Sequence, residues 1–143
     1  MGLDMYLEGR KHFLRRDYTN PELDVMEDGF PKTEHVLELA YWRKHPNLHR
    51  FIVDSFAGGI DNCQPILLVG KDLLAILDAI KSHRLPHGSG FFFGASPHPS
   101  RNKEDYDKSV ENDVLAFTAA MQWANAPYNK ETERRSIYYQ ASW

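Results

Sequence analysis

GLDMYLE at residues 2–8 and SIYYQASW at residues 136–143 are the two stretches that decide the fold. In the first stretch, Leu3, Met5 and Leu7 alternate with polar or mixed side chains, a period of two that is typical of a half-buried strand. In the second, Ile137 and Tyr139 begin the same alternation. Both ends of the chain are therefore predicted to be strands with one buried side.

Matched alternation also predicts how these strands lie. Two strands that each bury one side can share a core if they are neighbours in one sheet. We therefore expect four polar or aromatic side chains to share the opposite face, namely Asp4, Tyr6, Tyr138 and Gln140.

A further strand and a helix are predicted on either side of Pro46. Residues 35–42 alternate in the manner of a strand, and proline suits the first turn of a helix, where its missing N–H costs nothing. The helix is expected over residues 46–55, with an apolar stripe at positions 48, 51 and 52. A competing interpretation makes residues 34–43 helical, because positions 37, 40 and 41 also have helical spacing.

The remaining pattern completes a small domain over residues 1–143. A loop is expected at 17–32, strands at 65–69 and 90–94, and a helix at 73–80 that ends near His83. Asn102 is a candidate cap for a last helix, with its stripe at positions 106, 110, 114, 117 and 121. The predicted class is α+β, with a mainly antiparallel or mixed sheet of about five strands and about three helices.

Composition limits the partners of the protein. Seventeen basic and 20 acidic residues among 143 give a formal charge of −3, which does not favour long nucleic acids. The residues at the start do not resemble a signal peptide, and no apolar run reaches the ~20 residues of a membrane-spanning helix. A single cysteine, Cys63, fits a reducing compartment, so we expect a cytoplasmic protein without a membrane partner. Self-association is left open.

The run YWRKHPNLH at residues 41–49 is the first candidate site. Trp42 offers a stacking face, Arg43 and Lys44 offer cations, and the predicted helix start adds partial positive charge. Together with His49, these residues suit an anionic ligand that carries a ring. A solvated helix start beside core aromatics is the structural alternative.

A second cluster surrounds the cysteine. Under a catalytic interpretation, Cys63 is a nucleophile, His49 its base and Asp61 the group that orients the base. A lone cysteine beside an apolar strand is more commonly a small buried side chain. The histidines show no metal-ligand spacing, so neither a metal nor a cofactor is predicted.

Two further clusters have no recognised catalytic motif. The run GSGFFFG at residues 88–94 contains Ser89, and its glycines permit a close approach of the backbone to a ligand or a neighbouring strand. It lacks the Lys and Ser/Thr that end a phosphate-binding P-loop. At the end of the chain, Tyr138, Gln140 and Ser142 face the same side and are added to the candidate ligand-binding set.

Four motifs resemble a family of small uncharacterised proteins of bacteriophages and prophages. These motifs are GLDMYL at 2–7, YWRK at 41–44, SGFFFG at 89–94 and the final YYQASW at 138–143, and they span nearly the whole chain. The chain departs from the family pattern at Ala141, where Ser is usual, and at residues 45–46, where Ala-Asn is commoner.

The resemblance implies a bacterial host cytoplasm and two classes of function. The first is a protein that binds a small anionic, nucleotide-like ligand, with sequestration of a host immune signal as one role. The second is a small hydrolase or transferase that acts on a nucleotide-like substrate. Binding is placed ahead because the sequence has no nucleophile motif, metal set or cofactor loop, and aromatic faces with cations suffice to hold such a ligand.

Overall fold

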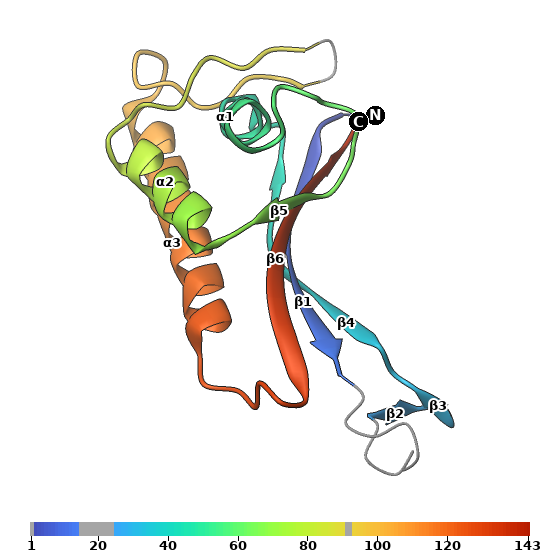
Figure 1. Ribbon diagram of the computed structural model, residues 1–143. Helices are drawn as coiled ribbons and strands as arrows, with labels where there is room; N and C mark the ends of the chain where they lie inside the picture. The colour runs from blue at the N-terminus through green and yellow to red at the C-terminus, as the bar shows by residue number, and fades with distance from the viewer. Residues whose placement is uncertain (1, 15–24, 91–92) are drawn as a thin grey trace.

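The computed structural model describes residues 2–14, 25–90 and 93–143. The strands of its main sheet are all antiparallel and have the order β4-β1-β6-β5. They are β1 (Asp4–Phe13), β4 (Glu34–Arg43), β5 (Ile66–Leu68) and β6 (Glu133–Ser142). Figure 1 shows the helices on one side of this sheet and both ends of the chain together at one end of it. The predicted α+β class is confirmed.

The first and last strands are neighbours, as predicted. β1 and β6 pair along their whole length, with Tyr6 opposite Gln140 and Glu8 opposite Tyr138. The four side chains expected to share a face therefore do so, and Ser142 joins them opposite Asp4. The other face of the same pair carries buried residues, which are Met5, Leu7, Ile137, Tyr139 and Ala141.

Residues 34–43 form strand β4, so the competing helical interpretation is wrong. Their polar groups pair with β1 along nearly its whole length, and the helix α1 (Pro46–Phe56) begins only after that pairing ends. Pro46 lies in the first turn of α1, as expected. Leu48, Ile52 and Val53 of this helix are buried against the sheet and its neighbours, and each such side chain contributes about 1.5–3 kcal/mol of hydrophobic stabilisation.

Two more helices complete the covered face. They are α2 (Gly70–Lys81) and α3 (Lys103–Asn125). Asn102 caps α3, because its side chain accepts a hydrogen bond from the Asp105 N–H. The stripe predicted for α3 lies on its inner side, where Phe117 is fully buried and the others are half-buried.

The strand expected at residues 90–94 is absent from the residues there that the structure describes. The Phe93 N–H instead donates to the Gly90 carbonyl oxygen across a turn, and Gly94 has a φ of +71°. Phe91 and Phe92 lie outside the described residues. An apolar run between glycines fits either a strand or a tight turn over a buried side chain, and here Phe93 is buried in the core.

Part of the loop expected at 17–32 is a β-hairpin. β2 (Met26–Glu27) pairs with β3 (Phe30–Pro31) through a two-residue turn. Both turn residues have positive φ, +53° at Asp28 and +83° at Gly29, and an Asp-Gly pair favours this turn. Residues 15–24 lie outside the described residues.

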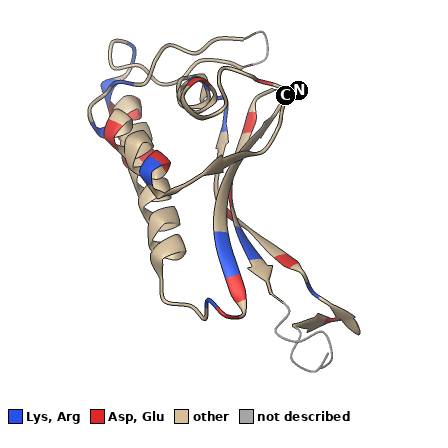
Figure 2. Ribbon diagram, viewed as in Figure 1, with Lys and Arg blue, Asp and Glu red and all other residues tan. Residues whose placement is uncertain are grey.

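The surface charge is mixed. Figure 2 shows basic and acidic residues interspersed over the same elements, in keeping with the formal charge of −3. Among the described residues, no helix combines the length and the apolar character needed to cross a bilayer.

Candidate functional site

The sequence clusters meet at one end of the sheet, where three glycines allow their segments to approach closely. A Cβ on Gly88 would lie 2.0 Å from a carbonyl oxygen in the first turn of α1, so the segment between α2 and α3 lies directly on that turn. A Cβ on Gly94 would lie 3.0 Å from Lys44, and one on Gly2 would lie 3.2 Å from Nη2 of Arg43. The start of β1, the end of β4 and this connecting segment therefore meet where α1 begins.

The outer face of the sheet carries a hydrogen-bonded trio at this end. Tyr41 donates to Oδ1 of Asp4 at 2.6 Å, and Nη1 of Arg43 donates to the same oxygen at 3.0 Å. The Tyr41 hydrogen bond and the Arg43 charge lower the pKa of Asp4 below its usual value, and the Asp4 hydrogen bond raises the pKa of Tyr41. The ring of Tyr6 lies 5.3 Å from that of Tyr41.

Another cation of this face, Arg10, is also paired. The Arg10 guanidinium lies 4.0 Å above the Tyr138 ring and within 3.3 Å of the Glu8 carboxylate. An anion on the outer face would therefore compete with Glu8 for Arg10 and with Asp4 for Arg43. This face offers aromatic surface but no unopposed positive charge at these two arginines.

The other residues of the predicted ligand-binding set do not join this face. Trp42 lies on the covered side, because successive strand residues point to opposite faces, and its ring stacks on Phe117 at 5.5 Å. His49 is buried in the core. Lys44 and Ser89 are exposed on the two segments that meet at α1. The predicted set is thus divided between two faces and does not form one site.

The structure brings His49 and Asp61 together. Nε2 of His49 lies 3.0 Å from both carboxylate oxygens of Asp61, and Nδ1 lies 2.6 Å from the Tyr139 hydroxyl. Burial raises the pKa of Tyr139 well above its usual 10.0, and the Asp61 charge adds to this. Tyr139 therefore keeps its proton. Because the Asp61 carboxylate can only accept, the proton of the neutral His49 ring is assigned to Nε2, and the Tyr139 hydroxyl donates to Nδ1.

Cys63 lines the same small site, but the site is closed. The residues around Cys63, His49 and Asp61 leave no space that admits a water molecule, and the Trp143 ring lies 5.8 Å from that of His49. Both ring nitrogens of His49 already have partners. In this arrangement, His49 is not free to take a proton from Cys63, and the hollow that Cys63 shares with His49 has no room for a substrate.

Replacing Tyr139 tests the hydrogen-bonded core. In Tyr139→Phe, Nδ1 of His49 loses its donor, so we expect a loss of about 1–3 kcal/mol of unfolding free energy near neutral pH. Because the folded-state pKa of Tyr139 is raised, its contribution is complete below pH 10 and is lost as the pH rises through that pKa. Above pH 10 the wild type should lose about 1.4 kcal/mol per pH unit more than the variant. Urea unfolding at a series of pH values measures both effects.

Tyr138→Phe is the matched control for this prediction. Tyr138 lies on the outer face, and its hydroxyl bonds no residue that the structure describes. Its removal should leave both the neutral and the alkaline stability close to those of the wild type. Equal alkaline slopes in the wild type and Tyr139→Phe would contradict the assigned burial of the Tyr139 proton.

A second histidine, His45, forms a buried chain of hydrogen bonds just before α1. Its Nδ1 lies 2.7 Å from Oγ of Ser96, and its Nε2 lies 2.7 Å from Oδ2 of Asp113 on α3. Oδ1 of Asp113 accepts the indole N–H of Trp42 at 2.8 Å. Ser96 also accepts the Asn47 N–H at 3.0 Å. Each end of the chain is thus closed by a further N–H donor.

The order Ser96, His45, Asp113 is that of a nucleophile, a base and an orienting acid. Two observations assign it a structural role instead. The Ser96 oxygen is buried and already accepts the Asn47 N–H. Ser96 also does not line the cavity of about 200 Å³ that lies beside this network. Satisfied polar networks of this kind fix the relative position of the elements that they join. Here they hold β4, α1, α3 and the segment before α3 together.

The sequence contained one signal for this network. Asp113 lies on the apolar side of α3, between the stripe positions 110 and 117, and a carboxylate on a buried helix face requires a partner. Its partners His45 and Trp42 are 68 and 71 residues away in the chain, so the pattern alone did not identify them.

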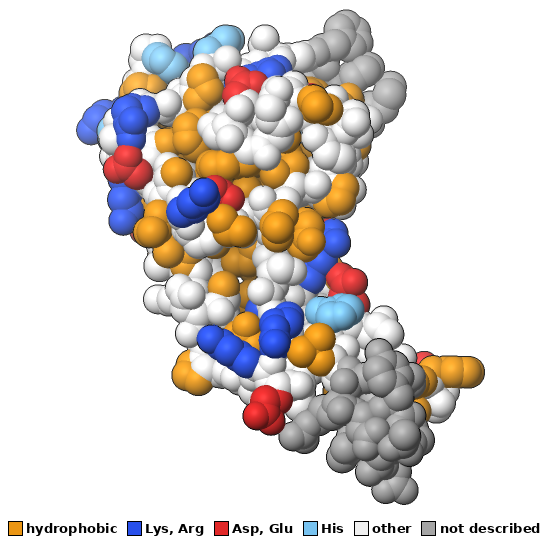
Figure 3. Space-filling model, viewed as in Figure 1, with side chains coloured by type: hydrophobic (Ala, Val, Ile, Leu, Met, Phe, Trp, Pro, Cys, Tyr) orange, Lys and Arg blue, Asp and Glu red, His pale blue; other side chains and the backbone are white. Residues whose placement is uncertain are grey.

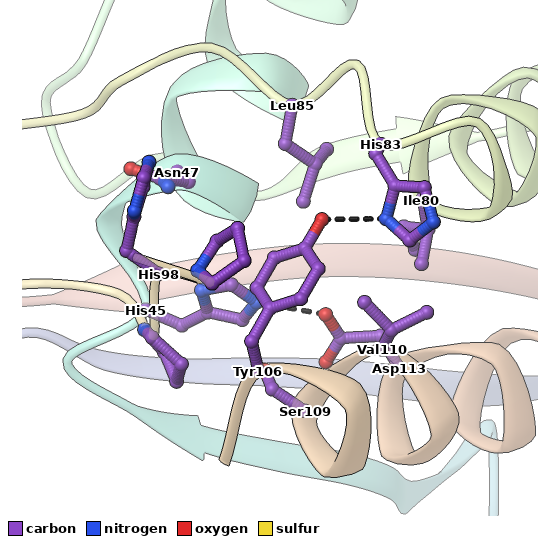
Figure 4. A pocket seen from close by; sticks show the side chains of 12 residues that line it. His45, Asn47, Ile80, His83, Leu85, His98, Tyr106, Ser109, Val110 and Asp113 are labelled. Atoms are coloured by element: carbon purple, nitrogen blue, oxygen red, sulfur yellow. Dashed lines mark hydrogen bonds and ion pairs between the residues drawn. The ribbon is translucent and has the colours of Figure 1, made fainter. Parts of the chain in front are cut away.

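A cavity of about 200 Å³ lies beside this network. Its polar lining comes from His45, Asn47, His83, His98, Tyr106 and Ser109, together with Asp113. Figure 4 shows Tyr106 rising from α3 with its hydroxyl toward His83, which follows α2. Apolar walls come from Ile80, Leu85 and Val110. Polar groups from several elements thus converge on one hollow, which is the usual form of a small-molecule site.

A wider hollow of about 410 Å³ lies between β5, β6 and the two long helices. It is lined mainly by aliphatic side chains, and exposed Leu67, Val69 and Leu74 extend the apolar surface around it. Figure 3 shows hydrophobic side chains gathered over β5 and α2 on this face. Because it lacks a set of converging polar side chains, the smaller cavity is the better candidate for a selective ligand site.

Comparisons with protein-family models, curated proteins and solved structures found no match to this chain. The candidate site therefore rests on its own geometry.

Proposed function

We propose that the protein binds a small ligand, of which one ring-sized part occupies the cavity beside His45. The observation that carries this proposal is a hollow of about 200 Å³ into which polar side chains from α1, α3 and the segment between α2 and α3 converge. That volume is below the roughly 300–1,000 Å³ of pockets that enclose drug-sized molecules. The cavity suits one ring with a polar substituent.

Binding is favoured over catalysis by the state of the two histidine–aspartate pairs. Both ring nitrogens of His49 and of His45 are held by protein partners at 2.6–3.0 Å. A general base must contact a nucleophile or a water molecule that can reach a substrate. Here the imidazoles contact Ser96, which is buried and does not line the cavity, and the buried Tyr139. In both pairs the imidazole instead bridges segments of the fold.

The wider role that we propose rests on the motif resemblance. A phage-type protein would act in the cytoplasm of a bacterial host, and its anionic, nucleotide-like ligand would be captured without conversion, for example as a host immune signal. The run at residues 41–49 supports a place for this ligand at the strand–helix junction, because His45 and Asn47 line the cavity. Lys44 lies close by in the chain and adds an exposed cation to the same end of the sheet, whereas Arg43 is paired with Asp4 on the outer face.

The test is to recover the ligand. The purified protein is incubated with a bacterial metabolite extract and with cyclic and linear nucleotides, and bound material is released by heat and identified by mass. We expect an unmodified small molecule at about one equivalent per chain, and at least about tenfold less from Ser109→Leu, which fills the cavity. Asn112→Leu, an exposed change on α3, is the control.

Two results would overturn this proposal. Equal recovery from Ser109→Leu and the wild type would place the ligand outside the cavity. Conversion of a substrate in excess over protein, lost in Cys63→Ala or His49→Ala, would favour the small hydrolase or transferase. In that case the closed site around Cys63 would have to open during turnover.

A further inference from the structure

The Asn47 side chain lines the cavity and has two hydrogen-bond donors on Nδ2. Its Oδ1 accepts the Gly88 N–H at 2.9 Å, which fixes the orientation of the amide. The two N–H groups on Nδ2 bond no residue that the structure describes, and Nδ2 is not among the buried atoms that lack a partner. Nδ2 is therefore not enclosed by protein, and Asn47 is one of the residues that line the cavity.

His98 also presents a donor. Its Nδ1 accepts the backbone N–H of Ser100 at 3.1 Å, and a ring nitrogen that accepts a backbone N–H carries no proton. The proton of the neutral ring is therefore on Nε2. The Ser100 hydroxyl, 2.6 Å from the same Nδ1, is consistent with this tautomer because it can donate as well.

His83 is oriented in the same way by Tyr106. The Tyr106 hydroxyl lies 2.6 Å from Nδ1 of His83. Burial and the nearby Asp107 charge raise the pKa of Tyr106, so its hydroxyl keeps its proton and can donate to Nδ1. Because Nδ1 contacts Tyr106, Nε2 is the ring nitrogen of His83 that remains for a ligand, and it is a donor when the Tyr106 hydroxyl donates to Nδ1. The Ser109 hydroxyl adds a further polar group to the lining.

The cavity has few acceptors to match these donors. Asp113 is the only carboxylate among the described lining residues, and its two oxygens are taken by His45 and Trp42. We propose that the cavity holds the oxyanion end of its ligand, a phosphate or carboxylate group, with Asn47, His83 and His98 as donors. This inference rests on the proposed function and names the chemical class that the cavity selects. Tyr106 and the aliphatic wall then accommodate the apolar part.

The charge of Asp113 opposes an anion in the same cavity, so the proposal requires that the donor bonds outweigh this repulsion. Four single-ring probes of similar size separate these effects: phenyl phosphate, benzoate, benzyl alcohol and benzamidine. Calorimetry and amide chemical shifts report affinity and place. We expect phenyl phosphate and benzoate to bind at the cavity at least about tenfold more tightly than benzyl alcohol and benzamidine.

The probes distinguish failure of this inference from failure of the proposed function. Benzyl alcohol or benzamidine binding at the cavity as tightly as the anions would overturn the oxyanion assignment and leave a ligand cavity in place. If none of the four probes shifts the cavity resonances and the metabolite extract yields no ligand, both proposals fail. Equal affinity for the phosphate and carboxylate probes supports the shared oxyanion chemistry. A preference for one probe shows which of the two groups the ligand carries.

Asn47→Asp gives the sharpest variant test. The new carboxylate keeps an acceptor for the Gly88 N–H but replaces the two free donors with acceptor oxygens. We expect phenyl phosphate affinity to fall at least about tenfold, with little change in melting temperature. Asn112→Asp adds the same charge on the exposed side of α3 and should change affinity by less than about twofold. If both variants lost the same affinity for phenyl phosphate, the added negative charge alone would explain the loss. That result would overturn the role of Asn47.

Discussion

Asp113→Ala is expected to lose about 3–5 kcal/mol of unfolding free energy, the largest effect of a single polar substitution in this protein. The carboxylate is 2% exposed and accepts from His45 at 2.7 Å and from the Trp42 indole at 2.8 Å. Its removal leaves two buried donors without acceptors, and burying an unpaired donor costs about 1–3 kcal/mol. Urea unfolding followed by circular dichroism measures the loss.

Two further variants separate the hydrogen bonds from the helix itself. Asp113→Asn keeps the shape and one acceptor oxygen, so its loss should lie between those of the wild type and the alanine variant. Asp107→Ala removes an exposed acid of the same helix, which pairs with Lys103 at 3.6 Å, and should cost no more than about 1 kcal/mol. A loss below this in Asp113→Ala would mean that the network contributes little to the fold.

The fold was predictable wherever one side of a helix or strand is buried and the other side is exposed to solvent. The period of two in residues 2–8 and 136–143 identified both central strands and their pairing, because a shift by one residue would bury Asp4 and Tyr6 and expose Met5 and Leu7. Pro46 identified the start of α1 for a local reason, since proline lacks the N–H that a first turn leaves unpaired.

The same reasoning fails where close backbone contacts decide the structure. Residues 88–94 have the apolar run and the glycines of a strand. Yet position 88 requires glycine because the backbone there lies against α1, and Phe93 belongs to a turn and buries its side chain in the core. A close approach of two backbone segments depends on where both segments lie. The sequence of one segment does not show where the other segment will be. The hairpin at Asp28 and Gly29 was missed for a different reason, because its strands are only two residues long.

For the site, residue types identified some partners but not their geometry. His49 and Asp61 were grouped as candidate base and acid, and they do meet, since only 12 residues separate them. The cavity was missed because His83, His98 and Ser109 come from segments that a pattern cannot place together. Trp42 and Arg43 were grouped as adjacent residues, although neighbours on a strand face opposite sides.

Gly88→Ala is expected to lose on the order of 3 kcal/mol, because overpacking against a fixed backbone costs up to about that amount. The added Cβ would lie 2.0 Å from the Pro46 carbonyl oxygen and 3.0 Å from the Asn47 nitrogen. Neither atom can move without shifting the first turn of α1, which is held by the hydrogen bonds of His49 in that turn and of His45 just before it. The segment between α2 and α3 must therefore lift away. Urea unfolding measures the loss, and hydrogen exchange at residues 82–102 locates it.

Gly70→Ala is the matched control, because a Cβ there meets nothing within 4 Å and the residue begins α2. Alanine restricts the unfolded chain more than glycine does, so this variant should be unchanged or up to about 1 kcal/mol more stable. In Gly88→Ala, the lifted segment also withdraws the N–H that orients Asn47, which should weaken phenyl phosphate binding together with stability. If the segment exchanges hydrogen as slowly as in the wild type and the stability is retained, the packing of this segment against α1 is contradicted. The wall that this segment gives to the cavity is then contradicted as well.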